Sequence, residues 1–344
     1  MQTESRFIRA CRGLSVDTIP VWFMRQAGRY QEEYRALRQR FGFMELATNP
    51  ELCTEVTCRP VEELGVDAAI LFSDIMVPLA PMGVEFQIKE SVGPIIAHPI
   101  RTAKDVEGLQ SMDPMEDLPF VIDAIGRITT RLGGTPLIGF AGGPFTLASY
   151  LVEGGSSRNY AHTKRLMWTE PKAWDALMNK LTDMVIQYLS AQIDAGAQAV
   201  QIFDSWVGAL APQDYRDYVL PYMSRLFSSL KSLLAPRIYF GVGTGSLLEL
   251  MAEAGPDVLS IDWRVPLPSA RQRLGGKIAL QGNLDPVRVT AGFAAVAEPI
   301  KDMVLAMKTQ PGYIFNLGHG VLPETSPEVL RQIVQWVHQT GGTE

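Results

Sequence analysis

Short apolar runs recur along this chain, and glycine or polar residues follow each of them. Eight such runs occur, and most are continuously apolar instead of alternating with polar residues. This pattern is typical of strands that are buried on both faces of a parallel sheet. The expected strands are Thr18–Met24, Ala68–Phe72, Thr135–Phe140, Gln198–Phe203, Pro236–Phe240, Val258–Ile261, Lys277–Leu280 and Gly312–Phe315.

Helical periodicity fills several intervals between these runs, with Pro171–Ala195 and Glu328–Val337 as examples. Strands that alternate with helices indicate βαβ units. Eight units in a chain of 344 residues predict an α/β fold, a closed (β/α)8 TIM barrel. An open doubly wound sheet is the competing architecture. No linker, repeat or low-complexity tract divides the sequence, so we expect a single domain over residues 1–344.

The intervals differ in length, and this predicts where the barrel departs from regularity. Long intervals after the first and second runs predict extra loops or helices over one end of the barrel. The intervals between the fifth, sixth and seventh runs are short, so their helices must be brief.

The polar ends of the runs carry the candidate chemistry. Because the carboxyl ends of barrel strands surround one mouth, where barrel enzymes have their active sites, we expect these residues to lie together. They are Arg25-Gln26, Ser73-Asp74, Gly142-Gly143, Asp204-Ser205, Gly243-Thr244, Asp262, Gln281-Asn283 and Gly318-His319.

Two arginines at the end of the first run are the clearest of these signals. Arg25 and Arg29 are four residues apart, with Gly28 between them. The guanidinium group is a planar, permanently charged fork that binds carboxylates or phosphates through two hydrogen bonds. The pair therefore predicts an anion clamp, and a salt-bridged surface loop is the ordinary alternative.

Other single residues leave two interpretations open. Asp74 is either a carboxylate of the site or the N-cap of a following helix, and the same choice applies to Asp204 with Ser205. Tyr150, on a helix after Gly142-Gly143, either faces the mouth or is packed. His319 lies between glycines that leave it exposed, which favours a functional role. The remaining histidines are expected to be structural or on the surface: His98, His162 and His338.

Composition narrows the class of protein further. With 47% hydrophobic and 20% charged residues the chain can bury a large core, and a net charge of −6 argues against a nucleic-acid partner. The sequence shows no signal peptide and no apolar run long enough to cross a membrane. Its three cysteines have no CxxC spacing, which favours reduced thiols. We therefore expect a cytoplasmic protein with no membrane partner.

Known cofactor and metal motifs are missing from the sequence. There is no P-loop, HExxH, GxSxG or Cys/His cluster, and Gly241–Ser246 departs from the dinucleotide-binding pattern at its third glycine. We therefore expect no metal and no cofactor. The chemistry must then depend on Arg, Asp, Tyr, Ser and His side chains.

Five segments of the chain, in order, resemble the uroporphyrinogen decarboxylase family. They are Pro20–Tyr30, Phe72–Ile75, Ile138–Tyr150, Ile202–Gly208 and Phe315–Gly320. The similarity extends over essentially the whole chain, and the first and last motifs are very specific together. In two departures, Gln31-Glu32 stands where many relatives have Leu-Pro, and Trp206 stands where some have His. Neither changes the residues assigned below.

The resemblance implies a (β/α)8 barrel that forms a homodimer. Such enzymes remove the four acetate carboxyls of uroporphyrinogen III to give coproporphyrinogen III, without a cofactor, on the route to haem and chlorophyll. By this resemblance Arg25 and Arg29 face the substrate carboxylates, and Asp74 accepts hydrogen bonds from the pyrrole N–H groups. The rest of the implied pocket is Gln26, Ala27, Gly28, Tyr150, Ser205 and His319.

A role for each group follows as a hypothesis. Asp74 stabilises a cationic intermediate, Arg25 and Arg29 orient the departing carboxyl, and His319 and Tyr150 mainly position the substrate. The proton donors stay open, although an unperturbed histidine is the easier acid on its pKa. Candidates for contacts with the outer propionates are Arg264 and Arg271.

Two other classes of protein compete with this hypothesis. Corrinoid or methyl-thiol methyltransferases share the barrel but hold zinc through His and Cys ligands, and this sequence has no matching set. A tetrapyrrole carrier without activity would keep the pocket but lose Asp74 or the arginines, which are all present here.

Overall fold

A parallel sheet forms the centre of the molecule. The computed structural model describes residues 4–89 and 92–342. In this part of the chain seven parallel strands are hydrogen-bonded in the order β1-β4-β5-β6-β7-β8-β9. These strands are β1 (Ala69–Ile70), β4 (Leu137–Gly142), β5 (Ala199–Phe203), β6 (Arg237–Phe240), β7 (Val258–Ser260), β8 (Ala279–Leu284) and β9 (Tyr313–Leu317). Each matches a predicted run, so the α/β barrel expectation is confirmed.

The first predicted run, Thr18–Met24, closes the ring without forming a complete strand. Phe315 N–H donates to Pro20 O (2.9 Å), and on the other side Asp67 N–H donates to Val21 O (2.7 Å). Only Val21 makes a formal strand pair, with Phe315. The prediction of a strand over 18–24 is therefore wrong in extent.

Side chains explain why this segment has so little strand pairing. Pro20 has no N–H to donate. The Asp67 carboxylate accepts the N–H of Val21 (2.7 Å), and the Asn316 amide oxygen accepts that of Met24 (3.2 Å). These donors are satisfied by side chains instead of a neighbouring strand.

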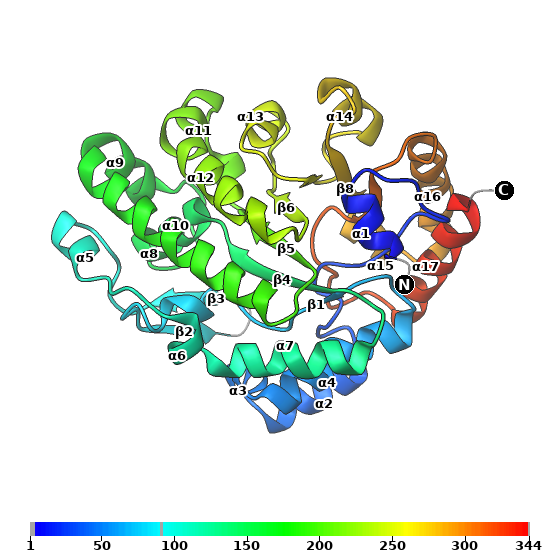
Figure 1. Cartoon of the computed structure of the whole chain (residues 1–344), viewed down its shortest axis with the longest axis horizontal. Coiled ribbons are helices and arrows are strands. Elements are labelled where there is room, and N and C mark those ends of the chain that lie inside the picture. Colours follow the sequence, from blue (N-terminus) through cyan, green and yellow to red (C-terminus); the bar gives the residue numbers. More distant parts are fainter. Residues whose placement is uncertain (1–3, 90–91, 343–344) are drawn as a thin grey trace.

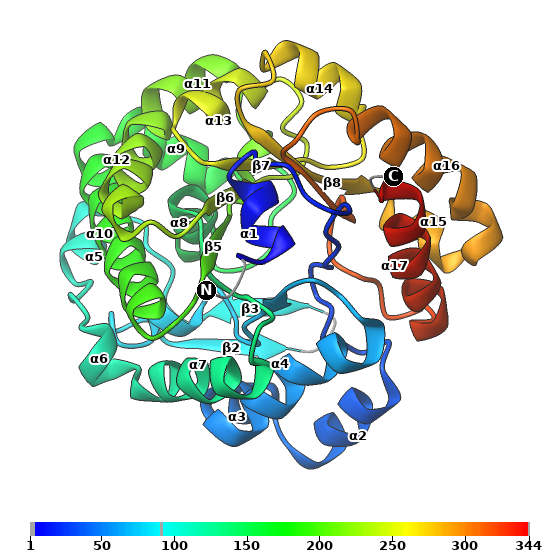
Figure 2. The same ribbon diagram turned by 45° about the vertical axis from the view of Figure 1, so that its right-hand side comes forward.

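Helices surround the sheet on its outside, and Figures 1 and 2 show this ring from two directions. The predicted helices Pro171–Ala195 and Glu328–Val337 are confirmed as α10 and α17. The described helices are α1 (Arg6–Cys11), α2 (Glu32–Arg40), α3 (Phe43–Thr48), α4 (Pro50–Leu64), α5 (Ala103–Glu107), α6 (Pro114–Asp117), α7 (Pro119–Leu132), α8 (Pro144–Glu153), α9 (Ala161–Thr169), α10 (Pro171–Asp194), α11 (Pro212–Tyr218), α12 (Leu220–Leu230), α13 (Leu248–Glu253), α14 (Leu267–Arg273), α15 (Pro286–Thr290), α16 (Phe293–Met307) and α17 (Pro327–Gly341).

The irregular intervals lie where their lengths predicted. The first long interval contains α2, α3 and α4, and the second contains an antiparallel hairpin of β2 (Phe86–Lys89) and β3 (Gly93–Ile96). The short intervals hold the brief helices α13 and α14. At the opposite end, α1 covers the amino ends of the strands, where Gly13 approaches Gly312. Among the helices that the structure describes, none has both the length and the apolar character needed to cross a bilayer.

A buried polar network ties the first segment to the barrel interior. The Trp22 indole N–H donates to Gln281 Oε1 (2.8 Å) on β8, and Gln281 Nε2 donates to Gln201 Oε1 and Ser260 Oγ (both 2.9 Å) on β5 and β7. All four residues have no exposed surface. Because an unpaired buried amide is costly, the three hydrogen bonds of Gln281 favour this entry of the first segment into the barrel, although Gln201 Nε2 has no partner among the described residues.

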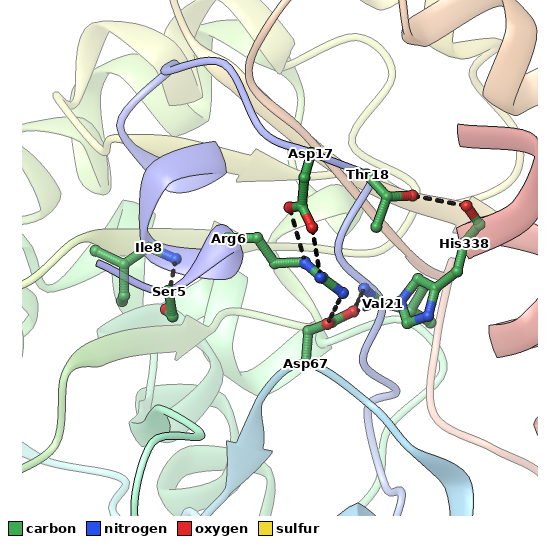
Figure 3. Close-up of polar contacts among 8 residues, drawn as sticks. All are labelled: Ser5, Arg6, Ile8, Asp17, Thr18, Val21, Asp67 and His338. Atoms are coloured by element: carbon green, nitrogen blue, oxygen red, sulfur yellow. Dashed lines mark hydrogen bonds and ion pairs between the residues drawn. The ribbon is translucent and has the colours of Figure 1, made fainter. Parts of the chain in front are cut away.

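A second network joins the two ends of the chain, and Figure 3 shows its members. The Asp67 carboxylate, whose side chain is 10% exposed, is 3.0 Å from Arg6 Nη1 on α1 and 2.7 Å from His338 Nε2 on α17. His338 is therefore structural, as predicted, and His98 is exposed at the surface.

Asp67→Asn should lower the free energy of unfolding by about 1–3 kcal/mol, because it removes the charged acceptor that Arg6, His338 and Val21 share. Urea denaturation measures this change. Asp17→Asn is the matched control: Asp17 also pairs with Arg6, but its side chain is 65% exposed, so its loss should cost about 1 kcal/mol or less. Equal losses in the two variants would contradict a special role for Asp67.

Candidate active site

A cavity of about 600 Å³ opens at the carboxyl ends of the strands. Its lining comes from the ends of β1, β4, β5, β6 and β9, from the loop after the first segment and from the β2–β3 hairpin. Eight of the nine predicted site residues line it: Arg25, Ala27, Gly28, Arg29, Asp74, Tyr150, Ser205 and His319. The structure thus brings together residues that are up to 294 positions apart (319 − 25) in the sequence.

Gln26 is the predicted residue that does not line the cavity. It is 1% exposed, its Nε2 donates to Ala68 O (3.1 Å), and its Oε1 accepts the N–H of Phe23 (3.2 Å). Its carbonyl oxygen also accepts the Tyr30 hydroxyl (2.6 Å). The side chain therefore braces the loop that presents the two arginines.

Arg25 has a backbone conformation that few side chains adopt. Its φ is +60°, in the left-handed region. The arginine stem lies directly against Gly320, where an added Cβ would be 2.5 Å from Arg25 Cδ. Within the part of the chain that the structure describes, no hydrogen bond or ion pair engages the Arg25 guanidinium. Its donors are available to an anion in the cavity.

Asp74 stands just beyond β1 at the base of the same cavity. Its Oδ1 accepts the Met76 N–H (2.9 Å) two residues ahead, and the side chain also lines the cavity. The N-cap of the short 3-10 turn that follows, Val77–Leu79, is Met76, so the alternative of Asp74 as a helix N-cap is wrong. Burial raises the pKa of Asp74, while the Met76 N–H and the positive charge of Arg25 act in the opposite direction. A cation or a set of N–H donors in the cavity would favour the ionised carboxylate further.

Tyr150 on α8 is stacked on Trp206, which follows β5. The ring centroids are 3.9 Å apart with an interplanar angle of 32°, and Tyr160 contacts the same indole at 5.3 Å. Burial, followed by the negative charge of Asp74, raises the pKa of Tyr150 to about 12, against the smaller effect of Arg25. The phenol is therefore neutral at physiological pH and can donate a hydrogen bond.

His319 follows β9 and is held in one tautomer. The flanking glycines do not leave it exposed, so that expectation is wrong: the ring is partly buried. Its Nδ1 accepts the N–H of Gly320 (2.7 Å), so the proton of the neutral ring resides on Nε2. Burial, followed by the nearby charge of Arg25, lowers the pKa of His319 to about 4. The imidazole is thus a neutral donor at pH 7, which agrees with a positioning role better than with that of an acid.

A titration of His319 by NMR should give a pKa near 4 instead of the ordinary 6.5. Because the unfolded chain takes up a proton more readily, this group should also make folding less favourable as the pH falls from about 6.5 to about 4. Arg25→Met should shift the His319 pKa upward, since it removes a neighbouring positive charge. A pKa near 6.5 in the native protein would contradict the proposed environment.

Part of the cavity lining is aromatic. Phe140, Phe203 and Phe240 come from the ends of three adjacent strands, with successive ring centroids 5.4 and 5.8 Å apart. Phe240 in turn contacts the His319 ring at 6.0 Å. This row offers an apolar surface to a ligand in the cavity.

Two further basic residues line the cavity and were missed in the sequence. Arg38 comes from α2, and Lys89 comes from the β2–β3 hairpin. Neither follows a barrel strand, so the pattern that located the other residues does not point to them. Arg38 lies at the end of an amphipathic helix, where a basic residue is ordinary.

The candidates for the outer propionates lie in different places. Arg264 is close enough to the mouth for its charge to act on His319, and it stacks on Trp263 at 4.2 Å. Arg271 donates instead to Pro311 O and Gly312 O (both 3.1 Å), before the start of β9. It is at the opposite end of the barrel, so its assignment to the substrate is wrong. The sequence did not reveal that α14 presents this residue to the amino ends of the strands.

Among the described residues, no three His, Cys, Asp or Glu side chains are grouped as a metal site would require. The three cysteines are free and buried.

Solved structures show the class of this protein. A methyltransferase from Methanosarcina mazei superposes with a TM-score of 0.82 at 23% identity, covering 98% of this chain and 99% of that one. A putative vitamin-B12 independent methionine synthase from Listeria monocytogenes superposes with a TM-score of 0.58 at 14% identity, covering 99% and 100%. These similarities concern the fold alone. Fold and site together define a TIM-barrel protein with an arginine-lined cavity at the carboxyl ends of its strands.

Sequence comparison identifies the family within this class. The family model described as uroporphyrinogen decarboxylase (URO-D) matches residues 2–340. A uroporphyrinogen decarboxylase of Thermobifida fusca (strain YX) is 52% identical over 335 residues, covering 97% of this chain and 92% of the relative. One from Geobacillus sp. (strain WCH70) is 51% identical over 337 residues, covering 98% and 97%. The chain belongs to the uroporphyrinogen decarboxylase family, whose members are carboxy-lyases of porphyrin biosynthesis.

Proposed function

We propose that this protein removes the four acetate carboxyls of uroporphyrinogen III to give coproporphyrinogen III, with Asp74 at the centre of the macrocycle. Membership of the family supports the assignment of this reaction. The observation that supports the assignment of the site is that Asp74, Arg25 and Arg29 line one cavity together with aromatic side chains. A highly acidic substrate requires arginines gathered at the site, because the chain as a whole is negatively charged and repels it.

The pyrrole ring itself supplies the electron sink that other decarboxylases obtain from a cofactor. Protonation of the ring at carbon gives a cationic, imine-like system, and the C–CO₂ bond can then break with its electrons flowing into the ring. CO₂ leaves, and its bonding electrons form an exocyclic C=CH₂ bond. A second proton converts this carbon to the methyl group, and the ring carbon then loses the first proton, which restores the aromatic pyrrole. One proton is consumed overall for each carboxylate lost. The protein must stabilise the cation and deliver protons.

Asp74 is the group suited to stabilise this cation. Its carboxylate is partly withdrawn from water and held by the Met76 N–H, so its orientation needs no change during the reaction. A charge placed in advance in a site of low polarity stabilises a transition state more effectively than the same charge in water. The pyrrole N–H groups would donate to this carboxylate and favour its ionised form.

Arg25 and Arg29 would bind the acetate and propionate carboxylates and orient the carboxyl that departs. Tyr150, Ser205 and His319 would hold the macrocycle in position. Tyr150 and His319 would do so as neutral hydrogen-bond donors. An arginine keeps its proton in almost any environment, so neither Arg25 nor Arg29 is suited to be the conventional acid.

The proposal also includes a single catalytic domain over residues 1–344, of which 1–3, 90–91 and 343–344 lie outside the described part. We expect a homodimer in the cytoplasm, supported by the resemblance to family members. Sedimentation equilibrium tests the dimer.

The decisive test is anaerobic incubation of the purified protein with uroporphyrinogen III, in the presence of a chelator and without any added cofactor. Products are oxidised and separated by their number of carboxyl groups. A progression from eight carboxyls to four supports the proposal. Binding without turnover would favour a carrier, and dependence on an added metal would contradict the cofactor-free mechanism.

A further inference from the structure

Two segments supply the wall of the cavity that contains Tyr150 and Ser205. Helix α8 carries Tyr150, and the loop after β5 carries Ser205 and Trp206. The structure joins them through a buried pair, Asp204 and Thr146, to which the proposed function assigns no role.

Asp204 caps α8 from a different strand. The Asp204 Oδ1 accepts both the backbone N–H (2.9 Å) and the hydroxyl (2.6 Å) of Thr146, in the first turn of the helix. The N-cap residue itself is Gly143, which has no side chain to accept this N–H. A Cβ on Gly143 would be 2.4 Å from Asp204 Cγ, so the glycine makes room for the carboxylate.

The Asp204 carboxylate is fully buried, and within the described chain no salt bridge reaches it. Its Oδ2 accepts the Tyr239 hydroxyl (3.1 Å), so three donors in all point at it. Burial raises the pKa of Asp204 to about 6, against the hydrogen bonds from Thr146 and Tyr239. A helix N-terminus favours the ionised form as well.

This arrangement determines the direction of the Thr146 hydroxyl. The hydroxyl hydrogen of Thr146 points at Asp204, so the hydroxyl oxygen is left as an acceptor. This oxygen accepts the backbone N–H of Trp206 (3.1 Å). Trp206 in turn supports the ring of Tyr150, one helical turn after Thr146. One hydroxyl thereby links the helix with Tyr150 to the loop with Ser205.

We propose that Thr146 is a positioning residue: held by Asp204, its hydroxyl fixes the Trp206 backbone and, through it, the Tyr150 ring and Ser205. Thr146 is part of the cavity lining, but its hydroxyl is engaged by Asp204 and by the backbone N–H of Trp206, so it acts through these residues and takes no part in bond breaking. This inference deepens the proposed function and rests on it, because its effect on catalysis requires Tyr150 and Ser205 to bind the substrate.

Thr146→Val is the principal test, because valine has the shape of threonine without the hydroxyl. It should raise the KM for uroporphyrinogen III roughly tenfold, the effect of one lost hydrogen bond, while kcat changes by about twofold or less. Thr146→Ser restores the hydroxyl and should recover most of the lost affinity. Asp204→Asn keeps an acceptor for Thr146 and should raise KM by about threefold or less.

Thr182→Val is the matched control. Thr182 is equally buried and its hydroxyl also donates a hydrogen bond, to Met178 O, but it lies on α10 outside the cavity lining. This variant should leave KM unchanged. Thermal unfolding of every variant checks that the comparison concerns folded protein.

A spectroscopic readout separates this inference from the proposed function. The fluorescence emission of Trp206 is obtained as the difference between the spectrum of each protein and that of the same protein carrying Trp206→Phe. This Trp206 emission should shift in Thr146→Val and should regain its wild-type position in Thr146→Ser, whether or not the protein turns over substrate. An unchanged KM together with unchanged Trp206 emission in folded Thr146→Val would overturn the inference. So would loss of kcat in Asp204→Asn with Thr146→Val unaffected, because the charge of Asp204 would then matter directly.

Discussion

Asp74→Asn should reduce turnover of uroporphyrinogen III by roughly 10³-fold, with a much smaller effect on stability. Asparagine keeps the shape of the side chain and an oxygen that can accept the Met76 N–H, so the local turn is retained. It removes the negative charge that the cationic intermediate requires. Single-turnover kinetics, with the products separated by carboxyl number, measure the loss.

Asp113→Asn is a matched control for this variant. Asp113 Oδ1 accepts the Met115 N–H two residues ahead at 2.9 Å, the same local bond that Asp74 makes with Met76, but at exposed α6. A loss of activity confined to Asp74→Asn would then come from the cavity and not from this local hydrogen bond. Near-normal turnover in Asp74→Asn would remove the central carboxylate from the mechanism.

Arg25→Lys should lower kcat/KM by roughly 10²-fold. Lysine keeps the positive charge but replaces a planar fork by a single flexible ammonium, so it cannot hold a carboxylate through two parallel hydrogen bonds. The left-handed backbone at this position and the close contact with Gly320 hold the arginine stem in one direction. Lysine has the same stem carbons, so this variant tests the loss of the guanidinium fork itself.

Steady-state kinetics with the octacarboxylate substrate measure this effect. Arg331→Lys is the control, since Arg331 pairs with Glu328 on the exposed face of α17 and should tolerate the exchange. If Arg25 binds a carboxyl group, the loss of kcat/KM in Arg25→Lys should be smaller for substrates with fewer carboxyls. An equal kcat/KM for wild type and Arg25→Lys would show that charge alone is sufficient at this position.

Local patterns in the sequence predicted the strands well, because seven of the eight predicted runs are buried on the barrel and are apolar for that reason. The first run shows the limit of such patterns. Thr18–Met24 is as apolar as the others, but side chains of Asp67 and Asn316 accept the N–H groups of Val21 and Met24. No local pattern reveals a partner that is 46 or 292 residues away.

The candidate site was predictable where a residue follows a barrel strand. Asp74, Ser205 and His319 all obey this rule, because parallel strands that form a barrel must end at one mouth. Arg38 and Lys89 come from an added helix and a hairpin, and Arg271 faces the other end of the barrel. Their positions depend on how secondary elements pack, and spacing in the sequence carries little information on that.

By itself, the sequence determined the fold class, the end of the barrel at which the site lies and the family to which the chain belongs. These properties depend on the repeat of buried strands and on motifs within a few residues, which are local. Only the tertiary structure decided the protonation of His319, the cap that Asp204 places on α8 and the contact between Tyr150 and Trp206. Burial, charge and hydrogen bonding between distant segments control these features, and they exist only once the chain has folded.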